Sequence, residues 1–199
     1  CLVGSEMCIR DRHMTMLGEA LDKVSLRECA TLDEIQQRIA EARTADPQAT
    51  QILGASWYPH AFASGQQPTA AMLDAVVADI PVILDANSLH AAWVNTAGLA
   101  ALGITRDTPD PLGGQIVRDA DGEPTGLLLE NAAIEYAWGY QAAHSTEADQ
   151  DRFLDNAFRS YLSSGTTGAT DMGFSDSDLA VFRRRLERDG RLPFPVDAH

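Results

Sequence analysis

Three side chains that could bind a metal ion or a substrate lie within six residues of one another in the segment SLHAAWVN, residues 88–95. His90 carries an imidazole that can bind a metal ion or contact a substrate near neutral pH. Trp93 can line a pocket, although tryptophan is by default a core residue. Asn95 is more typical of a helix cap than of a substrate contact. On the residues alone, the segment is either a packed helix that carries polar groups or one wall of a substrate site.

Three further candidates stand at the ends of predicted strands. Asp171 follows a run of small and β-branched residues at 165–170. Parallel α/β folds place their sites at the carboxyl ends of strands, so Asp171 is either an active-site carboxylate or a structural hydrogen-bonding group. Glu130 ends the second strand of a predicted hairpin, and its type alone indicates a solvated carboxylate. Trp57, in the predicted strand QILGASWY, is by default a core residue.

The N-terminal histidine is a weak metal signal by itself. His13 would be the second member of a His-x-His pair only if position 11 were histidine, and the sequence has Asp11 there. Residues 1–12 show no helical or strand period and no signal-peptide core, so we interpret them as a foreign junction. The remaining histidines, to which we assign no role, are His60, His144 and His199.

Composition narrows the class of protein. The formal net charge of −14 disfavours nucleic acid and anionic membranes as partners, because both are polyanions. The sequence has no apolar run of about 18 residues that would predict a spanning helix. The three cysteines lack metal-site spacing and indicate free thiols in a reducing compartment, which favours the cytoplasm. No GxSxG, phosphate-binding loop, CxxC or HExxH motif supports a serine hydrolase, kinase, dinucleotide or zincin site.

The hydrophobic pattern predicts an α/β protein. Helices are expected where apolar residues recur at helical spacing between capping and stop residues, and a hairpin is expected where two β-prone runs flank DADG. A strand, a helix and a strand in succession after residue 165 predict a parallel βαβ unit. The expected helices are 31–45, 69–79, 96–102, 146–164 and one after Ser175; the expected strands are 51–58, 81–86, 165–173 and 192–199, with the hairpin at 113–130.

A longer set of ordered positions resembles amidohydrolase family 3, a group that includes N-substituted formamide deformylases. The pattern is Pro-Val-x-Leu, then His-x-x-Trp-Val-Asn, a helix ending in Gly-Ile, Asp-Pro-x-Gly-Gly, and a hairpin ending in Pro-Thr-Gly-x-Leu-x-Glu. The strand before Asp171 resembles the family's Gly-x-Thr-x-x-x-Asp-x-Gly. The matching positions are Pro81, Val82, Leu84, His90, Trp93, Val94, Asn95, Gly103, Ile104, Asp110, Pro111, Gly113, Gly114, Pro124, Thr125, Gly126, Leu127 and Glu130.

The resemblance implies a partial metal-dependent TIM (β/α)8 barrel, of which only the first strands are present, with an inserted α+β subdomain. Residues 13–50 would hold the end of the first barrel strand and a helix. Residues 51–145 would be the insertion over the active-site mouth, and residues 146–199 would continue the barrel. The substrate pocket that the resemblance implies consists of Trp57, His90, Trp93, Asn95, Glu130 and Asp171.

The chemistry implied by the resemblance is hydrolysis of a carbon–nitrogen bond other than a peptide bond, in a small-molecule amide. The cofactor would be a divalent metal, most often zinc, which activates water and polarises the carbonyl. His13 matches the second histidine of the first-strand pair and is the one metal ligand we can name. The catalytic base and the other ligands would follow residue 199, so we expect this chain to be an inactive piece of a longer enzyme.

A second class of function stays open. An open catalytic metal site needs about three protein ligands, and the sequence offers one. The alternative is a non-catalytic small-molecule binding domain with a residual α/β core, in which Trp57, His90 and Trp93 line a pocket without a metal. Nothing in the sequence indicates an oligomeric state.

Overall fold

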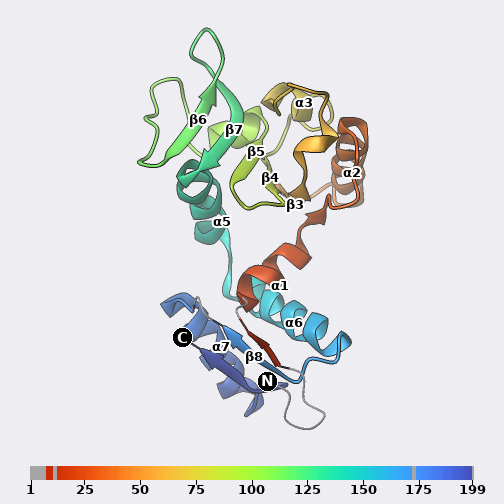
Figure 1. Cartoon of the computed structure of the whole chain (residues 1–199), viewed down its shortest axis with the longest axis vertical. Helices are drawn as coiled ribbons and strands as arrows, with labels where there is room; N and C mark the ends of the chain where they lie inside the picture. Colours follow the sequence, from red (N-terminus) through yellow and green to blue (C-terminus); the bar gives the residue numbers. More distant parts are fainter. Residues whose placement is uncertain (1–7, 11–12, 172–173, 199) are drawn as a thin grey trace. The chain divides into compact units, whose positions relative to one another are not determined.

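The computed structural model describes residues 8–10, 13–171 and 174–198, so most of the segment 1–12, Asp11 included, and His199 lie outside the described residues. The chain divides into two compact units (Figure 1). Unit 1 combines Cys1–Asp22 with Ser145–His199, and unit 2 is Lys23–His144. Unit 2 therefore contains residues 51–144 of the predicted insertion 51–145, and also the helix that precedes it.

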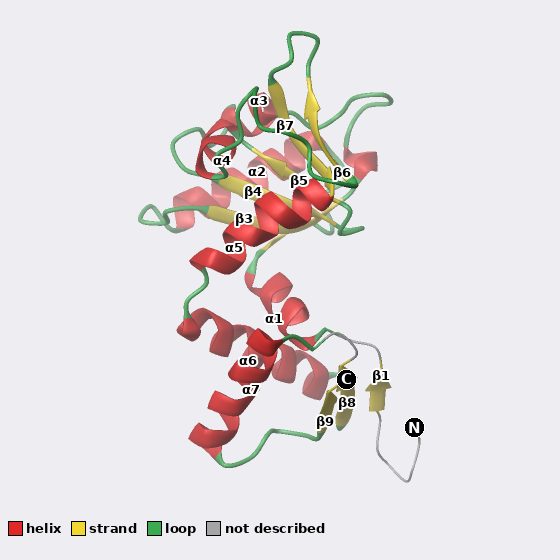
Figure 2. Ribbon diagram, turned by 90° about the vertical axis from the view of Figure 1, so that its left-hand side faces the viewer, coloured by secondary structure: helices red, strands yellow, loops and turns green. Residues whose placement is uncertain are grey.

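Unit 1 is built on a three-stranded parallel sheet. The strand order is β1 (Cys8–Arg10), β8 (Gly168–Asp171) and β9 (Val196–Ala198). Helix α7 (Asp176–Asp189) connects β8 to β9, which confirms the predicted βαβ unit. Helices α1 (Met14–Asp22) and α6 (Glu147–Ser163) complete the unit, and Figure 2 shows α6 and α7 beside its strands.

Local signals set the limits of the unit 1 helices. Thr146 begins α6 with a capping box in which its side chain accepts from Asp149 N–H. Ser175 begins α7 in the same way with Asp178, and Gly190 ends α7 in a left-handed conformation with φ 72°. The apolar faces of these helices then pack on β8 in one core, whose largest members are Met14, Leu154, Phe158, Tyr161, Phe182 and Phe194.

Helices α1 and α6 approach closely at Gly18. A Cβ atom built on Gly18 would lie 1.7 Å from the main-chain oxygen of Phe153. We expect Gly18→Ala to destabilise the protein by roughly 2 kcal/mol or more, because the backbone of α6 would have to move. Urea unfolding followed by circular dichroism at 222 nm measures the change.

A matched control exists in a helix with room for the methyl group. At Gly139 the nearest neighbour of an added Cβ would be the Ile134 oxygen at 3.8 Å. Gly139→Ala should be neutral or stabilising by about 0.5 kcal/mol, since alanine has the higher helix propensity. Equal effects of the two substitutions would show that the α1–α6 contact does not depend on Gly18.

Unit 2 contains a six-stranded mixed sheet. The strand order is β2 (Val24–Ser25), β3 (Ile52–Trp57), β4 (Val82–Ala86), β5 (Ala91–Val94), β7 (Pro124–Glu130) and β6 (Gly114–Arg118). Strands β2, β3 and β4 are parallel, whereas β5 is antiparallel to both β4 and β7. The carboxyl ends of β3, β4 and β7 consequently lie at one edge of the sheet, which we call the carboxyl edge.

Each face of this sheet packs against a hydrophobic core. Successive side chains of a strand point to opposite sides, so each strand contributes to both cores. Val82 and Leu84 join one core with Ile35 and Ile39 of α2 (Leu32–Ala45). Ile83 joins the other core with residues of α4 (Thr96–Ala101) and of the π-helix η2 (Ala133–Trp138). The shorter elements of unit 2 are η1 (Pro59–Ala61), α3 (Ala70–Asp74) and α5 (Gly139–His144).

Most predicted elements are present. The segment SLHAAWVN, for which a packed helix was one of two alternatives, contains strand β5, because its apolar residues are divided between the two cores of the sheet. The helix predicted at 69–79 ends at Asp74. Beyond it, the carbonyl oxygens of Val77 and Ile80 accept hydrogen bonds from the Asn95 side chain. These main-chain groups therefore bond to a distant residue instead of continuing the helix.

Candidate functional site

His13 and Asp171 meet at the carboxyl end of the parallel sheet of unit 1. Asp171 is the last residue of β8 and is 3% exposed, and His13 follows the neighbouring strand β1. The His13 Nδ1 atom lies 3.7 Å from Asp171 Oδ1, and Asp171 Oδ2 accepts the Met14 N–H at 2.9 Å. The structure thus brings together two predicted residues that are 158 positions apart in the sequence.

The pair places a buried carboxylate beside one ring nitrogen of a half-exposed histidine. The separation of 3.7 Å is longer than a direct hydrogen bond. The Asp171 carboxylate faces Nδ1, which leaves Nε2 as the ring nitrogen for a metal ion. Carboxylates behind metal-binding histidines fix the ring orientation and raise the basicity of the ligand.

The donor set in the described residues is incomplete for a metal ion. In residues 8–10, 13–171 and 174–198, no three histidine, cysteine, aspartate or glutamate side chains come together as a metal site. His13 fits the chemistry of one zinc ligand, but a catalytic zinc site uses about three protein ligands. Any site that includes His13 therefore needs donors beyond His13 and Asp171.

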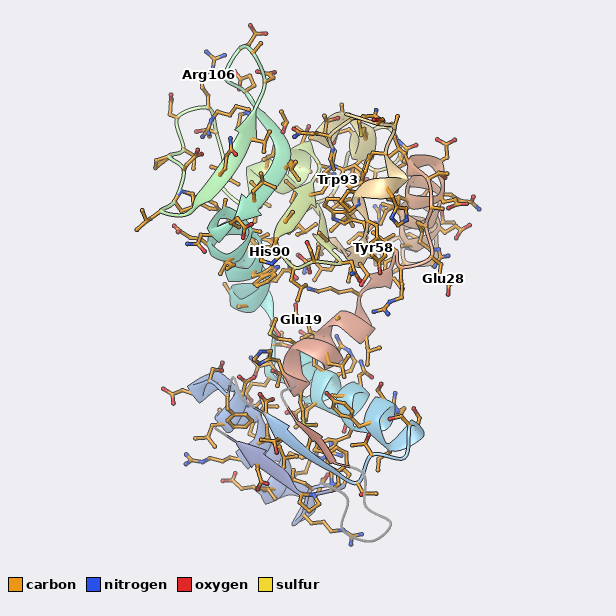
Figure 3. The ribbon with its side chains drawn as sticks, in the orientation of Figure 1. Glu19, Glu28, Tyr58, His90, Trp93 and Arg106 are labelled. Atoms are coloured by element: carbon orange, nitrogen blue, oxygen red, sulfur yellow. The ribbon has the colours of Figure 1, made fainter. Side chains whose placement is uncertain are left out.

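A second pair of predicted residues meets at the carboxyl edge of unit 2. His90 Nδ1 lies 2.8 Å from Glu130 Oε2, and the Glu130 N–H donates to the His90 carbonyl oxygen at 2.8 Å. Both side chains are more than half exposed. Figure 3 shows His90 and Tyr58 toward the same end of the unit 2 sheet, and Arg106 at the opposite end. Sequence reasoning placed each residue in a pocket but did not pair them.

The two predicted tryptophans lie in the core of unit 2. Trp57 is 3% exposed and Trp93 is fully buried, and their rings contact one another edge-on. Each indole N–H donates to a main-chain oxygen, Trp57 to that of Leu84 and Trp93 to that of Thr69. Their part in a substrate pocket stays a prediction, and their described contacts are those of core residues.

Both polar atoms of the Asn95 side chain form hydrogen bonds with main-chain groups. Its Oδ1 accepts from the N–H groups of Val82 and Gly98, and its Nδ2 donates to the oxygens of Val77 and Ile80. The residue is fully buried and caps α4, as its position before that helix predicts. A contact with substrate stays a prediction for Asn95, whose hydrogen-bonding groups are already occupied.

One buried polar cluster was not predicted from the sequence. Lys23 Nζ lies 2.7 Å from Asp85 Oδ2, and Trp138 Nε1 donates to Asp85 Oδ1 at 3.0 Å. Both side chains of the ion pair are less than 10% exposed. A carboxylate inside the apolar strand PVILDA was the available signal, because an aspartate in a buried strand requires a partner.

Cys29 has no features of a nucleophile. It is a buried free cysteine, and desolvation raises the pKa of its thiol. The thiol is therefore protonated near neutral pH, and buried neutral cysteines of this kind are unreactive.

A solved structure defines the class of fold. A metal-dependent hydrolase of uncharacterised function from Pyrococcus horikoshii OT3 aligns with a TM-score of 0.71 at 25% identity, over 98% of this chain and 36% of that protein. The mixed α/β arrangement of the chain is thus similar to that of metal-dependent hydrolases. Within the part of the chain that the structure describes, no helix has the length and apolar character needed to cross a bilayer.

The chain belongs to the amidohydrolase family, whose model matches residues 12–198. N-substituted formamide deformylase of Arthrobacter pascens is 33% identical over 192 residues, which are 92% of this chain and 34% of that protein. YtcJ of Bacillus subtilis (strain 168) is 39% identical over 124 residues, 61% of this chain and 23% of YtcJ. The chain therefore spans 34% or less of the length of these two relatives.

Proposed function

We propose that this chain forms part of a metal-dependent hydrolase that cleaves a carbon–nitrogen bond, other than a peptide bond, in a small-molecule amide. The observation that carries the proposal is the placement of His13 against buried Asp171 at the carboxyl ends of adjacent parallel strands. Membership of the amidohydrolase family and the deformylase relative support the reaction type.

In the proposed reaction, a divalent metal ion, most often zinc in this superfamily, would lower the pKa of a bound water molecule and polarise the amide carbonyl. His13 would hold that ion through Nε2. Asp171 would keep the imidazole in position and is itself held by the Met14 N–H. The further metal ligands and the general base are proposed to come from outside this chain, since the relatives are longer.

The proposal extends to architecture and location. Strands β1, β8 and β9 would be the first three strands of a (β/α)8 barrel, whose strand ends carry the site. Residues 51–145, nearly all of them in unit 2, would be the insertion that supplies the substrate pocket, including His90 and Glu130. The enzyme would act in the cytoplasm. The chain alone is proposed to be inactive.

A chimaera tests the function. The segment of the Arthrobacter pascens deformylase that matches residues 13–199 of this chain is replaced by those residues, and hydrolysis of N-substituted formamides is measured with and without zinc. We expect zinc-dependent release of amine from the chimaera and none from the 199-residue chain alone. A chimaera that folds and binds the formamide without hydrolysing it would support the non-catalytic binding domain instead.

Substitutions at the two strand ends test the residue roles. In the chimaera, His13→Ala is expected to abolish zinc-dependent activity, because it removes a ligand. Asp171→Asn should weaken zinc affinity by about 10–100-fold, as loss of an orienting carboxylate does. Zinc titration with a chromogenic chelator measures both. His144→Ala, which removes another exposed histidine, is the control, and equal zinc affinity in all three variants would refute the assignment.

A further inference from the structure

Backbone strain is concentrated at the carboxyl edge of unit 2. Among the described residues, the non-glycine residues with positive φ are Ser56 (72°), Leu89 (60°) and Glu130 (51°). Ser56 occupies the bulge in β3, Leu89 lies in the turn from β4 to β5, and Glu130 ends β7. Strained residues of this kind persist where the surrounding structure holds them, and they gather at binding and catalytic sites.

Two of these strained residues are connected with the His90–Glu130 pair: Glu130 is a member of it, and Leu89 directly precedes His90. The pair is fixed twice, by the Nδ1–Oε2 contact and by the main-chain hydrogen bond from Glu130 N–H to the His90 oxygen. The contact with the His90 ring engages Oε2 of the Glu130 carboxylate, so the other carboxylate oxygen, Oε1, is the acceptor for a ligand. The pair therefore presents a carboxylate acceptor that the histidine holds in place.

Exposed apolar residues lie close to His90 and Glu130 in the sequence or are joined to their neighbours by a hydrogen bond. In the described part of unit 2, the exposed large hydrophobic residues are Leu89 (48%), Leu112 (96%) and Ile134 (49%). Leu89 precedes His90, and Ile134 lies four residues after Glu130. Leu112 is tied to the neighbour of Glu130, because Asn131 Nδ2 donates to the Leu112 oxygen at 2.6 Å. Exposed apolar residues gathered at one edge mark an interaction site.

We propose that the His90–Glu130 pair binds the N–H or ammonium group of a ligand whose apolar substituent lies against Leu89, Leu112 and Ile134. A hydrogen-bond donor matches the carboxylate oxygen of Glu130, whereas an anionic head group would meet the Glu130 carboxylate and a protein of net charge −14. This inference rests on the proposed function only for the identity of the ligand. If the protein is an amide hydrolase, the N–H group belongs to the amide substrate and the ammonium group to the amine product.

Three hexyl probes with different head groups test the proposal on the 199-residue chain. The imidazole signal of His90 is followed by NMR while N-hexylformamide, hexylammonium or hexanoate is added. We expect saturable shifts with the formamide and the ammonium ion, and at least tenfold weaker binding of hexanoate. Binding of the formamide alone assigns the pair to substrate, and binding of the ammonium ion alone assigns it to product. Equal binding of hexanoate would overturn the proposal, because apolar contact would then explain it.

Variants separate the pair from its surroundings. Glu130→Gln should weaken hexylammonium binding at least tenfold, and His90→Phe should weaken binding of both donor probes, followed in that variant by backbone amide shifts of residues near 130. Glu135→Gln removes an exposed carboxylate on η2 and should change neither affinity. Unchanged binding in the two site variants would refute the proposal. If donor probes bind while the chimaera is inactive, the proposed hydrolase function fails alone; an active chimaera whose pair binds no donor refutes only this inference.

Discussion

Lys23→Met is expected to lower the free energy of unfolding of unit 2 by about 3–5 kcal/mol, the range found when one member of a buried ion pair is removed. The reason is that the carboxylate of Asp85, at 3% exposure, would lose the cation that lies 2.7 Å away in the core. Methionine retains most of the apolar stem of lysine, so lost packing contributes little. All three tryptophans of the sequence lie in unit 2, and fluorescence during urea unfolding therefore reports on that unit.

Two comparisons isolate the buried charge as the cause. Adding Asp85→Asn to Lys23→Met should restore a large part of the stability, because asparagine is neutral and its oxygen can still accept from Trp138 Nε1. Arg43→Met breaks the pair between Arg43 and the largely exposed Asp79, and should cost much less than Lys23→Met. If Lys23→Met costs no more than Arg43→Met, the pair between Lys23 and Asp85 is not a stabilising element.

Asn95→Ala is expected to destabilise unit 2 by about 3 kcal/mol. The substitution removes a helix cap and also leaves the N–H of Val82 and the oxygens of Val77 and Ile80 without their side-chain partner in the core. A lost cap costs about 1 kcal/mol, and each unsatisfied buried group adds about 1–3 kcal/mol before relaxation. Tryptophan fluorescence in urea measures this change as well.

A capping residue of the same helix provides the control for Asn95. Asp74 accepts from the Thr96 N–H at the start of α4, but it lies nearer the surface. Asp74→Ala should cost about 1 kcal/mol, which is the capping contribution alone. If both substitutions cost the same, the contacts of Asn95 with Val77 and Ile80 do not contribute to stability.

Elements whose ends depend on nearby residues were predictable from the sequence. The capping box at Thr31 and the cap at Ser175 predict the starts of α2 and α7, and the structure confirms both. The DADG turn predicts the hairpin of β6 and β7 with its correct limits. These signals are reliable because the two partners of each hydrogen bond lie within about four residues of each other.

Elements controlled by distant contacts were not predictable in the same way. The helical spacing at 69–79 is local, but Asn95 binds the main chain at Val77 and Ile80 from another element. The choice between helix and strand for SLHAAWVN depends on the neighbours of that segment, β4 and β7, which bury it on both faces. Short apolar runs have no period that could decide between these alternatives.

The same distinction applies to the candidate sites. The sequence by itself determined the family, through the ordered motif from Pro81 to Glu130, and it singled out His13 and Asp171 as side chains at strand ends. Only the tertiary structure decided which side chains meet. The parallel pairing of β1 with β8 sets His13 against Asp171, and the insertion of β5 between β4 and β7 sets His90 against Glu130. Strand order brings together residues that are far apart in the chain, and spacing along the sequence carries no record of that order.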